Sequence, residues 1–282
     1  MTSKSLLVTL LLTIHAAAVL GEGFYPDVNL REKLGQELRD RSKETLRDVP
    51  KAFDSREAWP NCIHPIRNQG GCGSCWAFGT SEVISDRLCI ATNGSEDVIL
   101  SPEELVDCNL IGMENCKRGG DPATAMVYTS VHGIASDSCY PYTAGQEGTG
   151  GTCRKTCADG KSLKLYKTKL TSLRWHTSVS GMQQAIYRGG PIVSCFSEYS
   201  DLSNDYDGRV YSHGANATRK GGHCVKIVGW GSMSANTTGE DYWIVANSWG
   251  QNWGPLGGYF LMKRGTNEGN IEREAFSIDP YL

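Results

Sequence analysis

Three short motifs that lie far apart in the sequence carry the parts of one reactive site, so the fold must bring them together. The motifs are NQGGCGSCWAF (68–78), GGHCVKIVGWG (221–231) and ANSWG (246–250). They supply a thiol at Cys75, an imidazole at His223 and an amide at Asn247. An imidazole activates a thiol only within hydrogen-bond reach, and an amide that orients the ring must contact its other nitrogen. The chain therefore needs a fold in which its two halves meet at one point.

These residue types predict nucleophilic acyl chemistry. The Cys75 thiolate would attack a carbonyl carbon, and His223 would take up the proton and return it to the leaving group. Gln69, in the same motif as the thiol, is the candidate donor to the oxyanion, together with the backbone N–H of Cys75. Trp249 follows Asn247 closely and is expected to shield the amide–imidazole contact from water, although core packing alone would also explain it.

The motifs resemble the papain family of cysteine proteases and, within it, the cathepsin B-like branch. The stretches that carry the resemblance, over roughly residues 49–275, are FDSREAWPNC (53–62), GCGSCWAF (71–78), SDRLCIATNG (85–94), GGH (221–223) and ANSWG (246–250). The resemblance implies a papain-like α+β fold with a helical N-terminal lobe at about 62–160 and an antiparallel, β-rich C-terminal lobe at about 161–275. The substrate cleft would lie between the lobes.

The resemblance also implies an activity, a cysteine endopeptidase that hydrolyses peptide bonds through an acyl-enzyme. Cys75 and His223 would rest as a thiolate–imidazolium pair, with no metal and no organic cofactor. Two other readings stay open: a catalytically inactive member of the fold that only binds, and acyl transfer to an amine in place of water. Replacement of Cys75 or His223 would have indicated the first, and neither is replaced.

The N-terminal region predicts a secreted precursor. Residues 1–21 read as a signal peptide, with Lys4 before an apolar run and small residues before the cut. A membrane anchor is the alternative, but His15 interrupts the run and leaves it short of a span. Residues 22–50 read as a short pro-segment that inhibits the domain at 51–282, or else as an N-terminal helix of that domain. The predicted location is the secretory pathway, ending in a lysosome- or vacuole-like compartment or outside the cell.

The pro-segment has an amphipathic pattern, and the overall composition limits the partners. Leu30, Leu34 and Leu38 recur at helical spacing among charged residues. Lys and Arg number 28 against 31 Asp and Glu, so there is no basic excess and nucleic acid is not an expected partner. After the leader no second long apolar run follows, so no membrane span is expected. The expected partners are protein and peptide substrates and the pro-segment itself, on a monomer.

Local patterns place the motifs on secondary structure. Ser74 is a candidate N-cap for a helix from Cys75 toward Ile90, which would put the thiol at the positive end of the helix dipole. Ser101 and Glu104 suggest a capping box. A third helix is expected over 121–133, and the expected strands are 191–196, 224–230, 241–249 and 258–264.

Eleven cysteines in a secreted chain indicate disulfides with at least one thiol left over. The cathepsin B-like resemblance implies four pairs: Cys62–Cys89, Cys72–Cys116, Cys108–Cys153 and Cys139–Cys157. Cys72 and Cys75 form a C-x2-C pair, but a zinc site would need a second ligand pair and a redox dithiol a βαβ context. Cys195 and Cys224 are expected to be buried free thiols, with a bridge between them as the alternative.

The resemblance further implies a substrate-binding set. Its members are Gly119, Gly120, Pro122, Cys195, Gly222, Cys224, Trp249 and Glu274. Of these, Glu274 in the IERE stretch (271–274) aligns with an acidic residue that lets cathepsin B accept arginine two residues before the cut bond. Glu274 is therefore expected to pair with a guanidinium, or else to be solvated or bridged elsewhere.

One loop bears on the mode of cleavage. In cathepsin B a long insertion with paired histidines blocks one end of the cleft and holds the substrate carboxylate. The matching segment, YPYTAGQEGTGGT (140–152), has no histidine, so we expect internal cleavage without dipeptide trimming from C-termini. Asn93, Asn216 and Asn236 lie in sequons and are candidate glycosylation sites.

Overall fold

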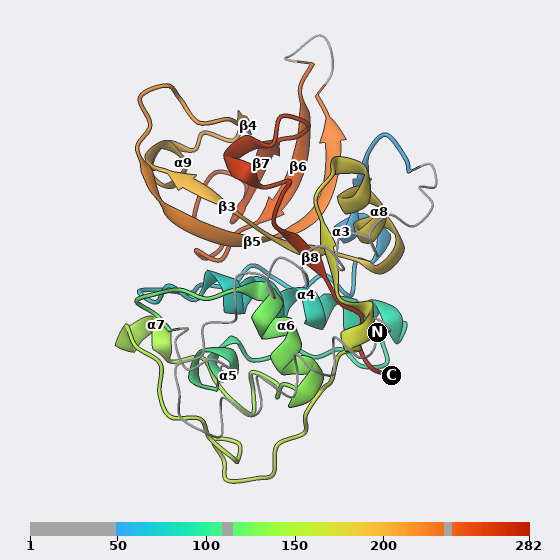
Figure 1. The fold of residues 1–282 in the computed structure, drawn as a ribbon, viewed down its shortest axis with the longest axis vertical. Coiled ribbons are helices and arrows are strands. Elements are labelled where there is room, and N and C mark those ends of the chain that lie inside the picture. The colour runs from blue at the N-terminus through green and yellow to red at the C-terminus, as the bar shows by residue number, and fades with distance from the viewer. Residues whose placement is uncertain (1–48, 109–114, 234–238) are drawn as a thin grey trace, which may run out of the picture.

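The computed structural model describes residues 49–108, 115–233 and 239–282. The predicted signal peptide, the leucine pattern of the pro-segment and the sequon at Asn236 lie outside these residues. Helices α4 to α7 lie in one half of the molecule and the large sheet lies in the other (Figure 1). The centre of the picture is occupied by α4 (Cys75–Ala91), with β5 (Arg219–Ser232) on the side of the sheet that faces it.

The helical half contains α4, α5 (Pro102–Asp107), α6 (Pro122–Val131) and α7 (Ala144–Glu147). They share a core in which Trp76, Ile84 and Met126 are at most 1% exposed. The predicted cap of α5 is present, because Ser101 accepts from the Glu104 N–H at 3.1 Å. The other half of the predicted capping box, a hydrogen bond between the Glu104 side chain and the Ser101 N–H, is absent. The Glu104 carboxylate accepts from the Ala135 N–H at 2.7 Å, so it ties α5 to another segment instead of closing a capping box.

The first turn of α4 also differs from expectation. The helix begins at Cys75 as predicted, but Ser74 makes no capping hydrogen bond. Its hydroxyl lies 2.7 Å from the hydroxyl of Tyr142, which holds it away from the helix. The leading N–H groups of α4 are thus left without a side-chain cap, next to the sulfur of Cys75.

The other half is an eight-stranded sheet, antiparallel except between β4 and β7. Besides β5, the sheet contains β1 (Phe53–Asp54), β2 (Arg174–His176), β3 (Ile192–Tyr199), β4 (Val210–Tyr211), β6 (Asp241–Ala246), β7 (Tyr259–Lys263) and β8 (Ala275–Ser277). The four strands expected from the sequence correspond to β3, β5, β6 and β7. Trp230, Trp243 and Phe260 fill the core of this half. The pairing that matters for the site is β3 with β5, which sets Phe196 opposite His223.

Two helices of this half are not evident in the sequence. They are α8 (Val179–Gly189) and α9 (Ser200–Asp205). In α8 the buried side chains Met182 and Ile186 repeat at helical spacing, but Gly181 and the short length hide the pattern. Ser178 begins the helix by accepting from the Gly181 N–H at 3.2 Å.

Both ends of the described chain cross between the halves. Near the start, β1 pairs with β5, and the ring centroids of Phe53 and Trp230 lie 5.4 Å apart. Near the end, the Lys169 N–H donates to the carbonyl of Asp279 at 2.8 Å, which holds the last residues on the helical half. The two halves are therefore tied together by backbone as well as by side chains.

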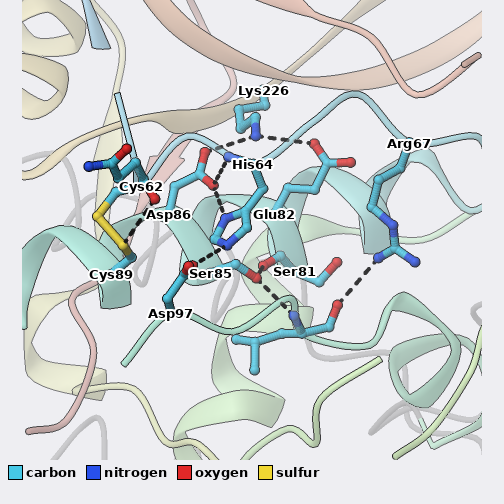
Figure 2. Close-up of polar contacts among 12 residues, drawn as sticks. Cys62, His64, Arg67, Ser81, Glu82, Ser85, Asp86, Cys89, Asp97 and Lys226 are labelled. Carbon is cyan, nitrogen blue, oxygen red and sulfur yellow. Dashed lines mark hydrogen bonds and ion pairs between the residues drawn. A yellow bond between two sulfur atoms is a disulfide. The ribbon is translucent and has the colours of Figure 1, made fainter. Parts of the chain in front are cut away.

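A cluster of charged side chains lies buried where α4 meets β5 (Figure 2). Lys226 of β5 points its ammonium between two carboxylates of α4, 2.8 Å from Asp86 and 3.5 Å from Glu82. His64 lies 2.6 Å from the other oxygen of Asp86 through Nδ1 and 3.0 Å from Asp97 through Nε2. Lys226 and Asp86 are 1% and 0% exposed, so this ion pair joins the two halves out of contact with water.

Candidate active site

The fold brings His223 and Asn247 into contact. His223 lies on β5, Asn247 directly follows β6, and the distance from Nε2 of the ring to Oδ1 of the amide is 2.8 Å. Trp249 stacks on the imidazole at 4.7 Å, and the ring of Phe196 meets it edge-on at 5.7 Å. The Asn247 oxygen also accepts from the Ser248 N–H, which fixes the amide. The ring is therefore held by one hydrogen bond and two aromatic contacts, with Nδ1 left for chemistry.

Cys75 lies at the same point. It is the first residue of α4 and the one free cysteine in the structure. Its sulfur interacts with three backbone N–H groups, those of Cys75 itself, Trp76 and Cys224. Cys224 is the neighbour of His223 in β5, so helix and strand converge on the thiol.

The pKa values of Cys75 and His223 are both shifted toward the neutral form of the side chain. Burial raises the pKa of the Cys75 thiol, while the three N–H groups lower it and the charge of Glu198 raises it further. Burial lowers the pKa of His223 to about 4, against the opposite effect of its hydrogen bond to Asn247. Each group taken alone thus favours its neutral form, and the resting ion pair expected from the sequence stays a prediction.

Gln69 is fixed beside this site by residues that the sequence reasoning missed. Its Nε2 donates to the Cys72 carbonyl at 2.9 Å, and its Oε1 accepts from the Ser248 hydroxyl at 2.6 Å. The Tyr142 hydroxyl donates to the Gln69 carbonyl at 2.7 Å. Nε2 keeps a second hydrogen for another acceptor. Ser248 could have been found, because it lies inside the ANSWG motif, whereas nothing in the sequence points to Tyr142.

The glycines of the predicted substrate-binding set have different surroundings. A β-carbon on Gly120 would lie 2.4 Å from the ring of Trp76, so only glycine fits there. Gly119 has a φ of +75° and precedes the turn into α6, whose first residue is Pro122. A β-carbon on Gly222 would meet no atom within 4 Å, which leaves open space beside His223.

Cys195 and Cys224 form a disulfide, so the prediction of two free thiols is wrong. They lie directly opposite each other in the pairing of β3 with β5, with Cα atoms 4.0 Å apart. The Cys195 N–H donates to the Glu274 carbonyl, away from β5, and pairs of this non-bonded kind bring side chains closest. This register was not readable from the sequence. The bridge leaves Cys75 as the unpaired member of the eleven.

The backbone of Glu274 contacts a residue of the predicted pocket. The Glu274 carbonyl accepts from the Cys195 N–H at 3.2 Å, and Glu274 is exposed to solvent. Glu272, in the same stretch, is buried and accepts from the Trp243 Nε1–H at 3.1 Å and the Gly265 N–H at 2.6 Å. Of the two acids, Glu274 is the one that is accessible beside the disulfide.

The segment 140–152 is short and packed onto the loop that holds Gln69. The Glu103 carboxylate accepts from the N–H groups of Thr143 and Ala144, each at 3.0 Å. The Gly145 carbonyl accepts from the Gly71 N–H at 2.8 Å, and a β-carbon on Gly145 would lie 2.7 Å from the Gln69 carbonyl. The segment therefore lies against the wall of the site, and its sequence contains no histidine, lysine or arginine that could hold a substrate carboxylate.

Four further disulfides occur, at the pairs that the resemblance implies. They are Cys62–Cys89, Cys72–Cys116, Cys108–Cys153 and Cys139–Cys157. Asn93 and Asn216 are both exposed, and Asn93 has a φ of +51° just after α4. Two surface hollows lie elsewhere, one lined by Ser130 and Lys167 among others and one by Arg87 and His176 among others, and neither is lined by Cys75.

Within 49–108, 115–233 and 239–282, no three or more His, Cys, Asp or Glu side chains are grouped so that they could hold a metal ion. In the same ranges no helix has the length and apolar character needed to cross a membrane.

Comparison with known proteins places this geometry in one family. The family model described as papain family cysteine protease matches residues 49–278. A cathepsin B-like protein of Giardia intestinalis is 39% identical over 231 residues, covering 82% of this chain and 74% of the relative. A gut-specific cysteine proteinase of Caenorhabditis elegans is 38% identical over 255 residues, covering 84% and 75%.

Solved structures agree. The procathepsin B of Trypanosoma congolense superposes with a TM-score of 0.73 at 34% identity, over 86% of this chain and 80% of that one. A ragweed pollen cysteine protease in its proform gives a TM-score of 0.70 at 27% identity, over 84% and 67%.

Proposed function

This chain belongs to the papain family of cysteine proteases, with cathepsin B-like relatives and a papain-like α+β fold, and we propose that Cys75, His223, Asn247 and Gln69 form its peptidase centre. One observation carries the assignment. The hydrogen bond from His223 to Asn247, at 2.8 Å, occupies one ring nitrogen at the place where the N-terminus of α4 presents the free thiol. The other nitrogen is then the one available to the sulfur.

The proposed mechanism uses these groups in order. The Cys75 thiol gives its proton to Nδ1 of His223, and the sulfur bonds to the substrate carbonyl carbon. The oxyanion accepts from the second hydrogen of Gln69 Nε2 and from the Cys75 N–H. The C–N bond breaks as His223 protonates the leaving amine. Water, deprotonated by His223, then adds to the thioester, and expulsion of the thiolate releases the acid.

Proton transfer between the buried neutral groups creates two opposite charges side by side. The N–H groups of Trp76 and Cys224 stabilise the thiolate, and the Asn247 oxygen stabilises the imidazolium. The rate of alkylation by iodoacetamide against pH separates the two resting states. A resting ion pair gives a rate that is flat from mildly acidic pH upward, whereas a neutral pair gives a rate that rises only at or above the ordinary thiol pKa of about 8.5.

Substitution of the nucleophile tests the assignment. We expect Cys75→Ala to lower peptide hydrolysis by at least about 10⁴-fold, the scale of losing a nucleophile or its base. The variant should keep its circular dichroism spectrum, because Cys75 forms no disulfide. Hydrolysis at the wild-type rate by Cys75→Ala would show that another residue attacks.

We propose that cleavage is internal, without release of C-terminal dipeptides. This mode of cleavage is supported by the segment 140–152, which lacks histidine and is packed against Gln69 and Gly71 at the wall of the site. Without a cation there, a free substrate carboxylate has no partner from this segment. Peptides with free and amidated C-termini should be cut at similar rates. Efficient stepwise removal of dipeptides from the free form would refute this mode.

We also propose that Glu274 selects arginine beside apolar side chains, two residues before the cut bond. The support is its exposure and the contact of its backbone with Cys195. A carboxylate there can pair bidentately with guanidinium. Glu274→Gln should lower the ratio of Arg to Leu cleavage at that position, and an unchanged ratio would remove Glu274 from the pocket.

Finally, we propose that the chain enters the secretory pathway as a precursor of a signal peptide, a pro-segment and the domain at 51–282. Five disulfides support an oxidising environment. Both solved neighbours are proforms by their descriptions, which supports an inhibitory segment here. Sequencing the N-termini of the secreted and active forms tests both cuts.

A further inference from the structure

Glu198 places a negative charge near the reactive thiol, and the proposed mechanism does not use this charge. It lies on β3, two residues beyond Phe196 and opposite Gly221 of β5. Alternate residues of a strand share a face, so Glu198 follows Phe196 on the face that meets the His223 ring. It is close enough to Cys75 for its charge to act on the thiol.

The surroundings keep this carboxylate partly dry. The residue is half-buried, and burial raises its pKa. Two groups act the other way: the Ser203 hydroxyl of α9 and the charge of Lys220 on β5 each lower the pKa of this carboxylate. Lys220 is exposed, so its attraction is weakened by solvent. The carboxylate thus keeps capacity for a closer cation.

This charge works against the chemistry in the free enzyme. A carboxylate near the sulfur disfavours the thiolate that must attack. A cation bound to Glu198 would cancel that effect at the moment when substrate is present. A basic substrate side chain would then gain both an ion pair and a more reactive thiol.

The position of Glu198 identifies which substrate residue could reach it. The proposed pocket for the residue two before the cut lies at Cys195 and Cys224. Glu198 is three residues farther along β3, about 10 Å at the rise of a strand, and on the other side of the His223 pair. With the proposed pocket holding residues before the cut bond, the side of Glu198 is the one that receives the leaving amine. Opposite it, a β-carbon on Gly221 would meet no atom within 4 Å, so the room is free.

We propose that Glu198 makes this enzyme prefer lysine or arginine immediately after the scissile bond. The proposal rests on the proposed peptidase function and adds a specificity determinant on the leaving-group side. An ammonium or guanidinium pairs with a carboxylate through charge-assisted hydrogen bonds, which uncharged side chains of similar length cannot form.

The test uses quenched fluorescent peptides that differ only in the residue after the cut bond, which is lysine, arginine, norleucine or glutamate. Wild type should have a kcat/KM roughly tenfold higher for lysine or arginine than for norleucine, the scale of one hydrogen bond to a charged group. Glu198→Gln should bring the ratio close to one. Glu57→Gln, an exposed acid on α3 (Ser55–Ala58), is the matched control and should keep the wild-type ratio.

Two further measurements exclude a merely structural effect. Lys220→Met should raise the lysine-to-norleucine ratio, because it removes the competing cation, and this variant retains Glu198 if Glu198→Gln folds poorly. In the free enzyme, Glu198→Gln should shift the pH profile of iodoacetamide alkylation to lower pH, whereas Glu57→Gln should not.

A wild type that cuts these peptides without preferring a cation would overturn the Glu198 proposal and leave the peptidase assignment standing. A preference that survives in Glu198→Gln would do the same. A wild type that cuts none of them, with Cys75 intact, would overturn both.

Discussion

Helix α4 and strand β5 meet at two polar clusters, one built around a buried ion pair and one around the reactive thiol. At one, Asp86 of α4 and Lys226 of β5 form a buried ion pair with His64 and Glu82 around it (Figure 2). At the other, the sulfur of Cys75, at the start of α4, interacts with the N–H of Cys224, the residue that follows His223 in β5. The first cluster has its central charges paired: both oxygens of Asp86 and the ammonium of Lys226 have partners.

Each cluster also keeps one buried atom without a hydrogen-bond partner among the described residues, Oε1 of Glu82 in the charged cluster and Nδ2 of Asn247 in the reactive one. In the reactive cluster, His223 uses one ring nitrogen for Asn247. Burial favours the neutral forms of both Cys75 and His223. Unmade interactions in the interior cost free energy, so the charged cluster and the core must hold the halves together while the thiol site stays available.

Of the changes considered, removal of the Lys226 charge should have the largest effect, which is on the stability of the domain. Lys226→Met fills a similar volume but leaves Asp86 and Glu82 as buried carboxylates without their cation. We expect the free energy of unfolding to fall by about 3–5 kcal/mol. Urea unfolding of the Cys75→Ala protein, with and without the change, measures this without self-digestion.

The double variant Lys226→Met/Asp86→Asn is the control. It removes the stranded charge, so part of the lost stability should return. A double variant that is less stable than Lys226→Met by the full cost of Asp86→Asn alone would mean that the two residues do not interact.

The matching change in the reactive cluster should affect rate more than stability. Asn247→Ala frees the His223 ring from its 2.8 Å hydrogen bond, and the ring contacts with Trp249 and Phe196 alone then position it. We expect kcat to fall roughly 10²-fold, the low end of what a well-positioned acid–base group contributes, with little change in KM. Asn247→Gln, which keeps the amide at a different reach, is the comparison. Equal kcat values for Asn247→Ala and wild type would show that the amide does not orient the ring.

The sequence predicted one of these clusters and not the other. The reactive site was predictable because its motifs are local and contain residue types with a specific chemical role. The charged cluster was not, since Lys226 lies inside a run of strand residues and Glu82 inside a helix, with nothing to show that they face each other.

The errors near the site have the same origin. The Cys195–Cys224 bridge depends on the register of β3 against β5, and the missing Ser74 cap depends on Tyr142 from a distant loop. Helix starts at Ser101 and Asp121 were predictable because a cap and its partner lie within one turn. Contacts between segments distant in sequence require the fold.

The smallest expected effect concerns how the charged cluster responds to pH. Its hydrogen bonds to Asp86 and Asp97 raise the pKa of His64 against the opposing effects of burial and of Lys226. A raised pKa in the folded state contributes stability below the unfolded value of about 6.5, and that contribution is lost as the pH rises through the folded pKa. Burial also raises the pKa of Glu82, so its ionisation costs stability in the same direction. These two groups should therefore stabilise the domain less at pH 8 than at pH 6. Burial lowers the pKa values of His176 and His223 to about 3 and about 4, so these two histidines act in the opposite direction over the same range.

His64→Asn tests this on the Cys75→Ala background. Asparagine can still donate to Asp86 but does not titrate, so the change in Tm from pH 6 to pH 8 should be more positive than in the His64 protein. His132→Asn, which changes a histidine outside the charged cluster, is the comparison, and it should alter the pH dependence of Tm less than His64→Asn does. The His64 and His64→Asn proteins would show the same change in Tm only if His64 did not change its proton occupancy on unfolding, and the contribution of His64 to stability would then not depend on pH in this range.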